Sequence, residues 1–430
     1  MKFALKWNLR NAGIGYCIII MLKYSNNDYF CSVIYTMIRQ YIAVLMLAVA
    51  FFASAQHDSS RLSELADSVP VDSVTDTVPQ KHGVIHRVLE YFKDSNKPKE
   101  YKRFDFSVIG GPHYSSDTKF GIGIVAAGFY RPNMADSLTM PSNVSLYGDI
   151  SSVGFYLIGI RGNHIFRNDS RRINYNLYFY SFPRKFWGIG YDNGIDMDNA
   201  SKFNELYIHA NVDMMWRLMR NFYIGPAAEF AHVRANKVFR PELWQGQDYS
   251  TFTTGVGLKV QYDTRDNLTA TRHGCLLMLE QRFCPRFMGN DYAFSYTSFQ
   301  ANWFKNVWKG GVIAANYHTR ISYGNVPWSM MSSFGGSNNM RGYYEARFRD
   351  KCEMDIALEL RQHVWRRNGI VVWAGAATVA PKISRFRSRH ILPNAGIGYR
   401  WEFKHLTNVR LDFGVGKGET SFIFSINEAF

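Results

Sequence analysis

From residue 104 to residue 430, segments of about ten residues alternate strictly between apolar and polar side chains, with clusters of turn residues between them. The clearest alternation, over residues 203–216, sets two groups against each other: Leu206, Ile208, Ala210, Val212, Met214 and Trp216 against Glu205, Tyr207, His209, Asn211 and Asp213. Successive side chains of a strand point to opposite faces. The pattern therefore predicts strands with one apolar and one polar face.

Three more segments show the same alternation, and their polar faces carry charges of both signs. The polar positions are Ala314, Asn316, His318 and Arg320 in 313–321; Asp355, Ala357, Glu359 and Arg361 in 355–362; and Arg410, Asp412 and Gly414 in 409–415. The apolar positions between them carry mostly Ile, Leu, Val, Phe, Ala and Tyr. A large sheet with one polar side is therefore expected.

Counting such segments predicts about sixteen strands, an even number of the kind that single-chain bacterial barrels have. The expected strands are 104–111, 119–131, 142–151, 153–166, 172–180, 203–217, 220–235, 249–265, 274–287, 292–307, 310–322, 352–366, 368–379, 391–401, 407–415 and 419–430.

Two architectures fit this pattern: a half-exposed soluble sheet, and a membrane barrel with its polar face in the lumen and its apolar face in lipid. After Ala55 no apolar run is long enough for a spanning helix, yet the chain holds 26 Tyr and 32 Phe. Tryptophans near expected strand ends suggest interfacial girdles: Trp187, Trp216, Trp303, Trp308, Trp328 and Trp401. We therefore expect an all-β, transmembrane antiparallel barrel of about sixteen strands.

The N-terminal 103 residues differ in texture from the rest. Residues 37–55 have a short basic start, an apolar run and a small-residue site, Ala53-Ser54-Ala55, as a secretory signal peptide does. Residues 1–36 do not fit a signal peptide, so we expect the true start at Met37 and a mis-assigned extension before it; a membrane anchor or two-helix hairpin is the alternative. Residues 56–103 are expected to form a periplasmic linker with a short amphipathic helix at 84–93.

The charge balance is basic but diffuse. The formal net charge is +15, and without residues 1–55 it is 45 − 34 = +11. Because the cations are spread along strands, we expect no nucleic-acid partner, and we expect contact with outer-membrane lipid and lipopolysaccharide. Cys275, Cys284 and Cys352 lack metal-ligand spacing, and a Cys275–Cys284 disulfide is disfavoured because both lie in one expected strand.

The segment 333–350, between the eleventh and twelfth expected strands, is unusual for a loop. It opens with turn residues, Gly335 to Asn339, and then carries four bulky apolar or aromatic side chains and five charged ones. An ordinary exposed loop rarely holds so many aromatic side chains. We expect this loop to fold back into the barrel, with an ordinary exposed loop as the alternative.

Three motifs resemble the BamA/TamA superfamily of outer-membrane proteins, over about residues 104–430. Met340-Arg341-Gly342-Tyr343 is similar to the family's V-R-G-[FY] motif in the sixth extracellular loop. The motif of Asp263, Arg265 and Asp266, with Gly274 beyond it, is similar to the D-x-R-D-N…G strand-end motif. The closing strands, with 409–414 and Phe430, complete the resemblance. It implies sixteen strands and a loop-six arginine that pairs with acidic residues in the lumen.

The alternation places Glu359 and Asp412 on polar faces, and a buried arginine needs carboxylates within reach of its planar fork. We therefore predict that Arg341, with Gly342 and Tyr343 beside it, forms a structural lock with Asp412 or Glu359; the alternative is a solvated arginine. Two departures from the family stand out. Trp373-Ala374-Gly375 occupies a place where relatives often have an acidic residue, and residues 56–103 are too short for a periplasmic POTRA domain.

Two functions remain in view. The first is outer-membrane protein assembly or translocation, in which expected strand 104–111 parts from 421–430 and a periplasmic or outer-membrane protein is a partner. In this view Gly110-Gly111-Pro112 ends the first strand early and weakens the seam. Separately, the last strand is expected to place Phe430 on one face with Phe422, Phe424 and Ile426, as the closing strand of a barrel does. The alternative is a passive, anion-leaning channel or a structural surface barrel.

An enzyme is not expected. Gly336-Ser337-Asn338 is superficially similar to the Ser-Asn pair of barrel phospholipases, but Gly335 stands where a histidine base belongs. No nucleotide-binding, zinc-protease or hydrolase motif occurs. We expect no catalytic residue, no cofactor and no metal site, because His82 and His86 alone supply too few ligands.

Overall fold

The computed structural model describes residues 104–115, 119–130, 141–404 and 406–430. The chain divides into two units, Met1–Lys81 and His82–Phe430, and every described residue belongs to the second. The expected signal peptide, the start at Met37, the linker and the short helix all lie outside the described residues.

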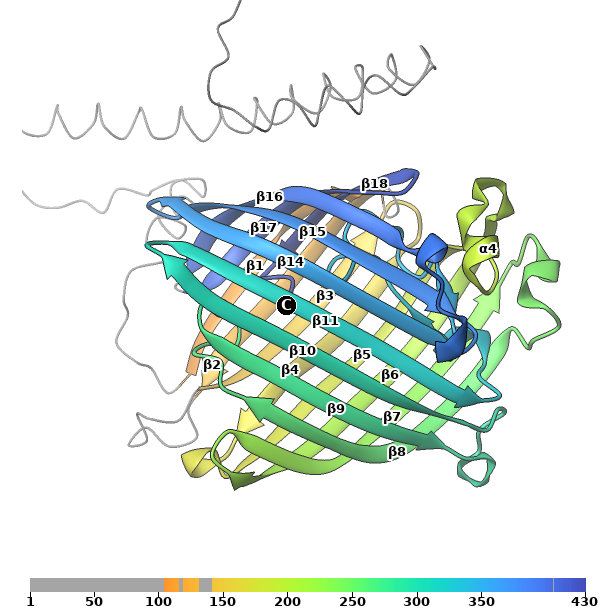
Figure 1. Cartoon of the computed structure of the whole chain (residues 1–430), viewed down its shortest axis with the longest axis horizontal. Helices are drawn as coiled ribbons and strands as arrows, with labels where there is room; N and C mark the ends of the chain where they lie inside the picture. Colours follow the sequence, from red (N-terminus) through yellow and green to blue (C-terminus); the bar gives the residue numbers. More distant parts are fainter. Residues whose placement is uncertain (1–103, 116–118, 131–140, 405) are drawn as a thin grey trace, which may run out of the picture. The chain divides into compact units, whose positions relative to one another are not determined.

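One antiparallel sheet of sixteen strands dominates the fold, and each strand pairs with the next one along it. Figure 1 shows this sheet curling round, with the blue-green strands in front and the orange to green strands behind. The strands are β1(Phe104–Ser115), β2(Lys119–Tyr130), β3(Ser142–Ser151), β4(Tyr156–Ile165), β5(Arg171–Phe186), β6(Ser201–Met219), β7(Phe222–Asn236), β8(Ser250–Asp263), β9(Gly274–Cys284), β10(Phe294–Trp308), β11(Gly311–Gly324), β14(Cys352–Trp365), β15(Asn368–Ala380), β16(Leu392–Lys404), β17(Thr407–Gly416) and β18(Glu419–Ile426).

The predicted all-β class and the predicted number of strands are confirmed. The long loop falls between the eleventh and twelfth strands of the sheet, β11 and β14, as the alternation indicated. It contains a second, two-stranded sheet, β12(Ser332–Ser333) with β13(Arg349–Asp350), which brings the two ends of the loop together. Strand ends differ from the predictions by a few residues, most of all in β5, which extends to Phe186.

In the part of the chain that the structure describes, the helices are short and lie between strands. The α-helix is α4(Tyr191–Ile195), and the 3-10 turns are η1(Arg167–Asp169), η2(Met197–Asn199), η3(Pro241–Trp244), η4(Arg286–Met288), η5(Trp328–Met330), η6(Ile383–Arg385) and η7(Ser388–His390). Among the described residues, no helix has the length and apolar character that crossing a membrane requires.

The two faces of the sheet differ as the alternation predicted. On β6, Glu205 and Asp213 are buried, whereas Ile208 and Val212 on the other face are 38% and 40% exposed. The same holds on β14, where Asp355, Ala357 and Glu359 are buried while Ile356 and Leu358 are exposed. The polar faces therefore line the interior, and the apolar faces form the outer surface.

The prediction that tryptophans form girdles on the outer surface is only partly correct. Trp216, Trp303 and Trp308 are 39%, 47% and 52% exposed on the outer surface. Trp187 and Trp328 are instead buried, and Trp328 packs in a core with Phe186, Phe203 and Trp244. Both buried tryptophans lie in connecting segments that fold over the interior rather than in strands, so alternation does not apply to them.

The first and last strands of the sheet lie next to each other, with Cα atoms of β1 and β18 within 8 Å. No strand ladder joins the described residues of these two strands, whereas every other neighbouring pair in the sheet is joined by an antiparallel ladder. We call this β1–β18 boundary the seam. The prediction that Gly110-Gly111-Pro112 ends the first strand is wrong, because β1 continues to Ser115 with Pro112 opposite Ile122. An edge strand tolerates proline, since one of its sides has no ladder to support.

The chain leaves the sheet before its last residue. Strand β18 ends at Ile426, and Asn427 has a left-handed φ of 68°, which breaks the alternation. Phe422 and Phe424 face outward, but the Phe430 ring lies 6.2 Å from that of buried Phe304. The prediction that Phe430 shares their face is therefore wrong.

The three described cysteines are free thiols. Cys275 and Cys284 both belong to β9, so the prediction that no disulfide joins them is confirmed.

Candidate functional site

The loop of residues 325–351, which we call the inner loop, is folded against the interior rather than exposed. Its Phe334, Met340, Tyr343 and Phe348 are buried in one cluster with Val379 and other apolar residues of β15 and β16. Phe334 and Phe348 stack with ring centroids 5.6 Å apart. The aromatic content that set this segment apart in the sequence therefore packs the loop onto the barrel wall. The prediction that the loop folds back is confirmed.

Arg341 lies at the tip of the inner loop and is 2% exposed. Its Nη1 donates to Asp412 Oδ2 on β17 at 2.6 Å, and its Nη2 donates to Glu359 Oε1 on β14. One guanidinium group thus joins two strands that are separated by β15 and β16 in the sheet. The structure brings together the arginine and both carboxylates that the sequence singled out.

Each of these carboxylates also has a second arginine. Glu359 Oε2 accepts from Arg361 Nε at 2.8 Å, and Asp412 Oδ1 accepts from Arg400 Nη1 at 2.5 Å. Arg400 Nε in turn donates to Glu428 at 2.8 Å, and Arg410 Nη1 lies 3.5 Å from Asp412. We call these seven residues the arginine cluster: Arg341, Arg361, Arg400, Arg410, Glu359, Asp412 and Glu428.

Trp373 explains how the cluster works without the acidic residue that relatives often carry. Its ring lies under the guanidinium of Arg341, with Cζ 3.8 Å from the ring centroid. A cation over an aromatic face is attracted by the ring quadrupole, more strongly when both are desolvated. The aromatic ring therefore supplies Arg341 with a third attractive contact beside its two carboxylates, and the cluster as a whole has four arginines and three acids.

Glycines allow the tip of the inner loop to approach the β17 backbone closely. Gly342 has a φ of +118°, and a Cβ at this position would lie 2.8 Å from the carbonyl carbon of Val415. A Cβ on Gly414 would meet the Arg341 carbonyl oxygen at 2.6 Å, and one on Gly416 would meet the Tyr343 ring at 2.7 Å. Only residues without a side chain permit this contact.

Tyr343 fixes the other side of the tip. Its hydroxyl donates to the Pro393 carbonyl at 2.6 Å and accepts from the Lys417 amide at 2.8 Å. Burial raises the pKa of this hydroxyl to about 12. The inner loop is thus anchored at three consecutive residues, each by a different kind of contact: ion pairs at Arg341, close backbone packing at Gly342 and hydrogen bonds at Tyr343.

With this geometry in view, comparisons with known proteins place the fold. Residues 161–430 match the Omp85 superfamily domain. The chain belongs to the Omp85 superfamily. The resemblance to BamA/TamA barrels is thereby confirmed, and membership implies an outer-membrane β-barrel of bacteria. No curated protein sequence matches the chain.

Two solved structures share the Omp85 barrel fold with this chain. One is BamA from Haemophilus ducreyi lacking POTRA domains 1-3, at 13% identity and a TM-score of 0.50, covering 76% of this chain and 71% of that one. The other is CdiB from Escherichia coli, at 10% identity and a TM-score of 0.50, covering 76% of this chain and 60% of that one. At such identities the likeness concerns the fold alone.

The second Omp85-like motif forms a turn rather than part of the arginine cluster. Asp263 accepts from Arg265 Nε at 2.9 Å and from Arg172 Nη1 on β5 at 3.2 Å. Asp266 accepts from the backbone amides of Arg272 and His273 at 3.0 Å and 3.2 Å, which closes the β8–β9 connection. The described contacts of Asp263 and Asp266 include no residue of the arginine cluster.

Sequence reasoning missed several members of the arginine cluster. The alternation placed Arg361 and Arg410 on the polar faces, next to Glu359 and Asp412, but sequence reasoning did not assign them to the same cluster as Arg341. Glu428 had no such signal, because strict alternation places it on the face of Phe422 and only the backbone break at Asn427 turns it inward. At Ser337, the hydroxyl contacts Asn338 Oδ1 at 3.5 Å, and among the described residues no histidine is bonded to it.

Proposed function

We propose that this Omp85 barrel acts in outer-membrane protein assembly or translocation, and that its seam is where a client strand engages. The observation that carries the proposal is the seam itself. The sheet of sixteen strands ends at β1 and β18, which are neighbours in space, and no strand ladder joins their described residues. The end of a sheet is where another strand can be added.

The lengths of the two seam strands support this proposal. β18 has eight residues, whereas β1 has twelve. A full-length ladder between them is therefore not available, and about four residues of β1 exceed the reach of β18. Opening the seam breaks fewer hydrogen bonds than opening a boundary such as β5–β6, where sixteen residues pair.

Site-specific photocrosslinking in cells expressing the full chain tests the proposal. A photoreactive side chain replaces Phe424 on β18, which is 53% exposed, or Leu258 on β8, which is 57% exposed and serves as the matched control. We expect adducts with newly made outer-membrane proteins at Phe424 and few at Leu258. Equal adduct yields at the two positions would contradict a role for the seam.

The second candidate is a passive, anion-leaning channel or structural surface barrel. It is favoured by the excess of arginine over carboxylate in the arginine cluster, which makes the interior attractive to anions. Conductance in planar bilayers separates the two: a steady anion-selective current without seam adducts favours the channel. In either case we propose contact of the apolar outer face with lipid, contact with lipopolysaccharide, and no nucleic-acid partner.

We also propose that the protein is not an enzyme. Purified protein is expected to hydrolyse no phospholipid, and Ser337→Ala is expected to change nothing. Lipid hydrolysis that disappears in Ser337→Ala would contradict this. A periplasmic or outer-membrane protein partner is proposed for the assembly role, and copurification from crosslinked cells is the direct search for it.

A further inference from the structure

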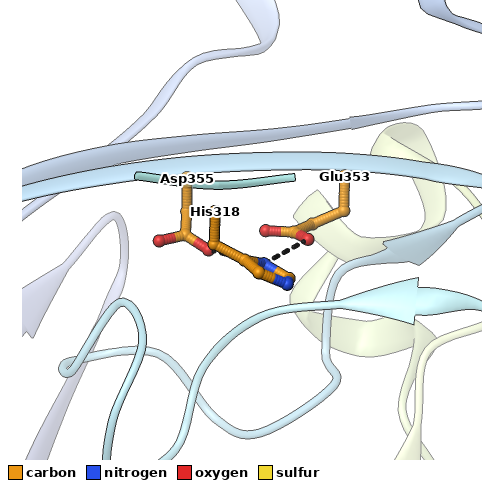
Figure 2. Close-up of side chains that lie close together, drawn as sticks. All are labelled: His318, Glu353 and Asp355. Carbon is orange, nitrogen blue, oxygen red and sulfur yellow. Dashed lines mark ion pairs between the residues drawn. The ribbon is translucent and has the colours of Figure 1, made fainter. Parts of the chain in front are cut away.

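At the opposite end of β14 from Arg361, three potential metal ligands converge. His318 on β11 and Asp355 on β14 lie directly opposite each other in the strand pair, and Glu353 is two residues from Asp355 on the same face. Figure 2 shows the imidazole beside the Glu353 carboxylate, with the Asp355 carboxylate on the other side of the His318 side chain. His318 Nδ1 lies 3.1 Å from Glu353 Oε2 and 3.3 Å from Asp355 Oδ2.

These separations suit a shared metal ion. Bonds of about 2.0–2.2 Å from zinc to imidazole nitrogen or carboxylate oxygen place neighbouring ligand atoms roughly 2.8–3.1 Å apart in octahedral geometry and roughly 3.3–3.6 Å apart in tetrahedral geometry. One nitrogen and two carboxylate oxygens lie within 4.8 Å of one another here. The three ligand atoms are therefore close enough to share one ion after small side-chain rotations.

Glu353 is the independent sign that something positive belongs here. The residue is fully buried, at 0% exposure, and neither of its carboxylate oxygens accepts a hydrogen bond from the described residues. His318 Nδ1 is near enough for an ion pair but does not meet hydrogen-bonding geometry either. Burying a carboxylate without hydrogen bonds is costly, and a coordinating cation removes that cost.

The nearest arginine on the same face does not supply the missing charge. Arg320 is two residues from His318, but its guanidinium lies over the Tyr296 ring, 3.8 Å from the centroid, and its Nη2 reaches the Met330 carbonyl at 3.4 Å. Within the described residues, no lysine or arginine forms an ion pair with Glu353 or Asp355. Two carboxylates thus face one imidazole.

Supporting contacts already orient two of the three ligands. Asp355 accepts from Asn316 Nδ2 at 3.1 Å and from Asn339 Nδ2 of the inner loop at 3.2 Å. His318 Nε2 lies 3.4 Å from the Ser298 hydroxyl. In the tautomer that carries its proton on Nε2, the imidazole donates a hydrogen bond to the Ser298 hydroxyl, and the lone pair of Nδ1 points at the carboxylates. Metal-bound histidines are usually oriented by such a second hydrogen bond.

Space for further ligands adjoins the three side chains. A cavity of about 280 Å³ is lined by His318 and Glu353, together with Ser298, Tyr296 and Ser332. Its lining is mostly polar, and its volume leaves room for the waters that complete a coordination shell.

We propose that His318, Glu353 and Asp355 bind a first-row divalent metal ion, and that Zn²⁺ binds more tightly than Mn²⁺. One imidazole and two carboxylates suit zinc and manganese, and for a given set of such ligands affinity rises from Mn²⁺ to Zn²⁺. The site is independent of the proposed role of the seam, since it lies on β11 and β14. It also joins the wall to the inner loop, because Asn339 holds Asp355.

Titration calorimetry on the full chain in detergent micelles tests the site. The protein is stripped with a chelator, any affinity tag is removed, and Zn²⁺ or Mn²⁺ alone is added. We expect one Zn²⁺ per chain and weaker Mn²⁺ binding. Glu353→Gln is expected to weaken Zn²⁺ binding by more than the roughly 10–100-fold that loss of a supporting partner costs, and Asn339→Ala by an amount within that range.

The matched control is His209→Gln. His209 Nε2 lies 3.2 Å from Glu229 in the same interior, but it faces a single carboxylate. This variant is expected to bind Zn²⁺ as the wild type does. Gel mobility with and without heating checks that each variant folds.

A second measurement on unmodified protein covers the case in which Glu353→Gln does not fold. Co²⁺ bound to the wild type is expected to give ligand-field absorption that Zn²⁺ abolishes, and X-ray absorption of the zinc form is expected to show nitrogen and oxygen ligands only. No Zn²⁺ binding, binding that survives Glu353→Gln unchanged, or a sulfur-containing shell would overturn the proposal.

Discussion

Two parts of the same face of β14 surround their buried acids with different charges. Glu359 contacts two guanidinium groups, from Arg341 and Arg361. Glu353, six residues earlier, faces an imidazole and a second carboxylate, Asp355. Both glutamates are 0% exposed. Burial and residue type are therefore matched, and only the surrounding charge differs.

The comparison shows that the charges around a buried carboxylate in this barrel decide whether we assign it a structural role or a binding role. Where arginines converge, the acid joins strands and holds the inner loop, so we expect its loss to destabilise the barrel. Where acids converge, the protein keeps an electrostatically unfavourable arrangement, which suggests a ligand. Four substitutions test this contrast, from the largest expected effect to the smallest.

Asp412→Asn is expected to have the largest effect. Asp412 lies within ion-pair distance of Arg341, Arg400 and Arg410, so its neutralisation leaves three buried guanidinium groups with less compensation. We expect a loss of about 3–5 kcal/mol in the free energy of unfolding. The temperature at which the folded band disappears in a heat-modifiability gel measures it.

Asp213→Asn is the control for Asp412→Asn. Asp213 is also buried but pairs with one cation, Lys259, at 3.0 Å. A smaller loss is expected there. Equal losses in the two variants would mean that convergence of the arginines adds nothing.

Arg341→Ala is expected to cost about 3 kcal/mol, the low end for a broken buried pair. The reason is that Glu359 keeps Arg361 and Asp412 keeps Arg400 when Arg341 is removed. Heat-modifiability and the yield of folded barrel are the measurements. Wild-type stability in Arg341→Ala would rule out the structural lock. Arg341→Lys keeps the charge but not the planar fork of the guanidinium, so its stability is expected to lie between that of the wild type and that of Arg341→Ala.

Gly342→Ala tests the approach of the inner loop to β17 without changing any charge. A Cβ there lies 2.8 Å from backbone and the φ of +118° is unfavourable for alanine, so we expect a loss of about 1–3 kcal/mol. Gly336→Ala is the control, because its φ is also positive at +85° but its Cβ would meet only the Glu345 side chain, at 3.2 Å. A larger loss at Gly336 would show that backbone strain, not contact with β17, dominates.

Glu353→Gln is expected to have the smallest effect, and of opposite sign. Without metal, removing one of two neighbouring carboxylates relieves repulsion, so stability should stay the same or rise by up to about 1 kcal/mol. Thermal unfolding in a chelator measures this, beside Asp412→Asn under the same conditions. A loss as large as that of Asp412→Asn would show that Glu353 is a structural partner of His318 and would remove the contrast.

The sequence carried much of the fold because period-two alternation directly reports which side of a sheet each residue occupies. It located sixteen strands, the place of the inner loop, and the inward position of Glu359 and Asp412. It failed where the backbone leaves the strand: Asn427 reverses the facing of Glu428 and Phe430, and Trp187 and Trp328 lie in segments that fold inward.

The site at His318 was invisible for a different reason. Alternation places His318 and Asp355 on polar faces, but their meeting depends on the register between β11 and β14. Register is set by how two strands pair, and a single sequence does not display it. The motif of Asp263 and Asp266 was recognisable from spacing alone because its contacts are local.

The glycine contact between the inner loop and β17 has a mechanical consequence. Gly342 and Gly414 bring two backbones together with no side chain between them, and β17 is the hydrogen-bonded neighbour of β18. The same strand, β17, therefore carries the contact with the inner loop on its residues and the ladder to the strand at the seam. We expect a displacement of the inner loop to be felt at the seam, and a displacement of β18 to be felt at the inner loop.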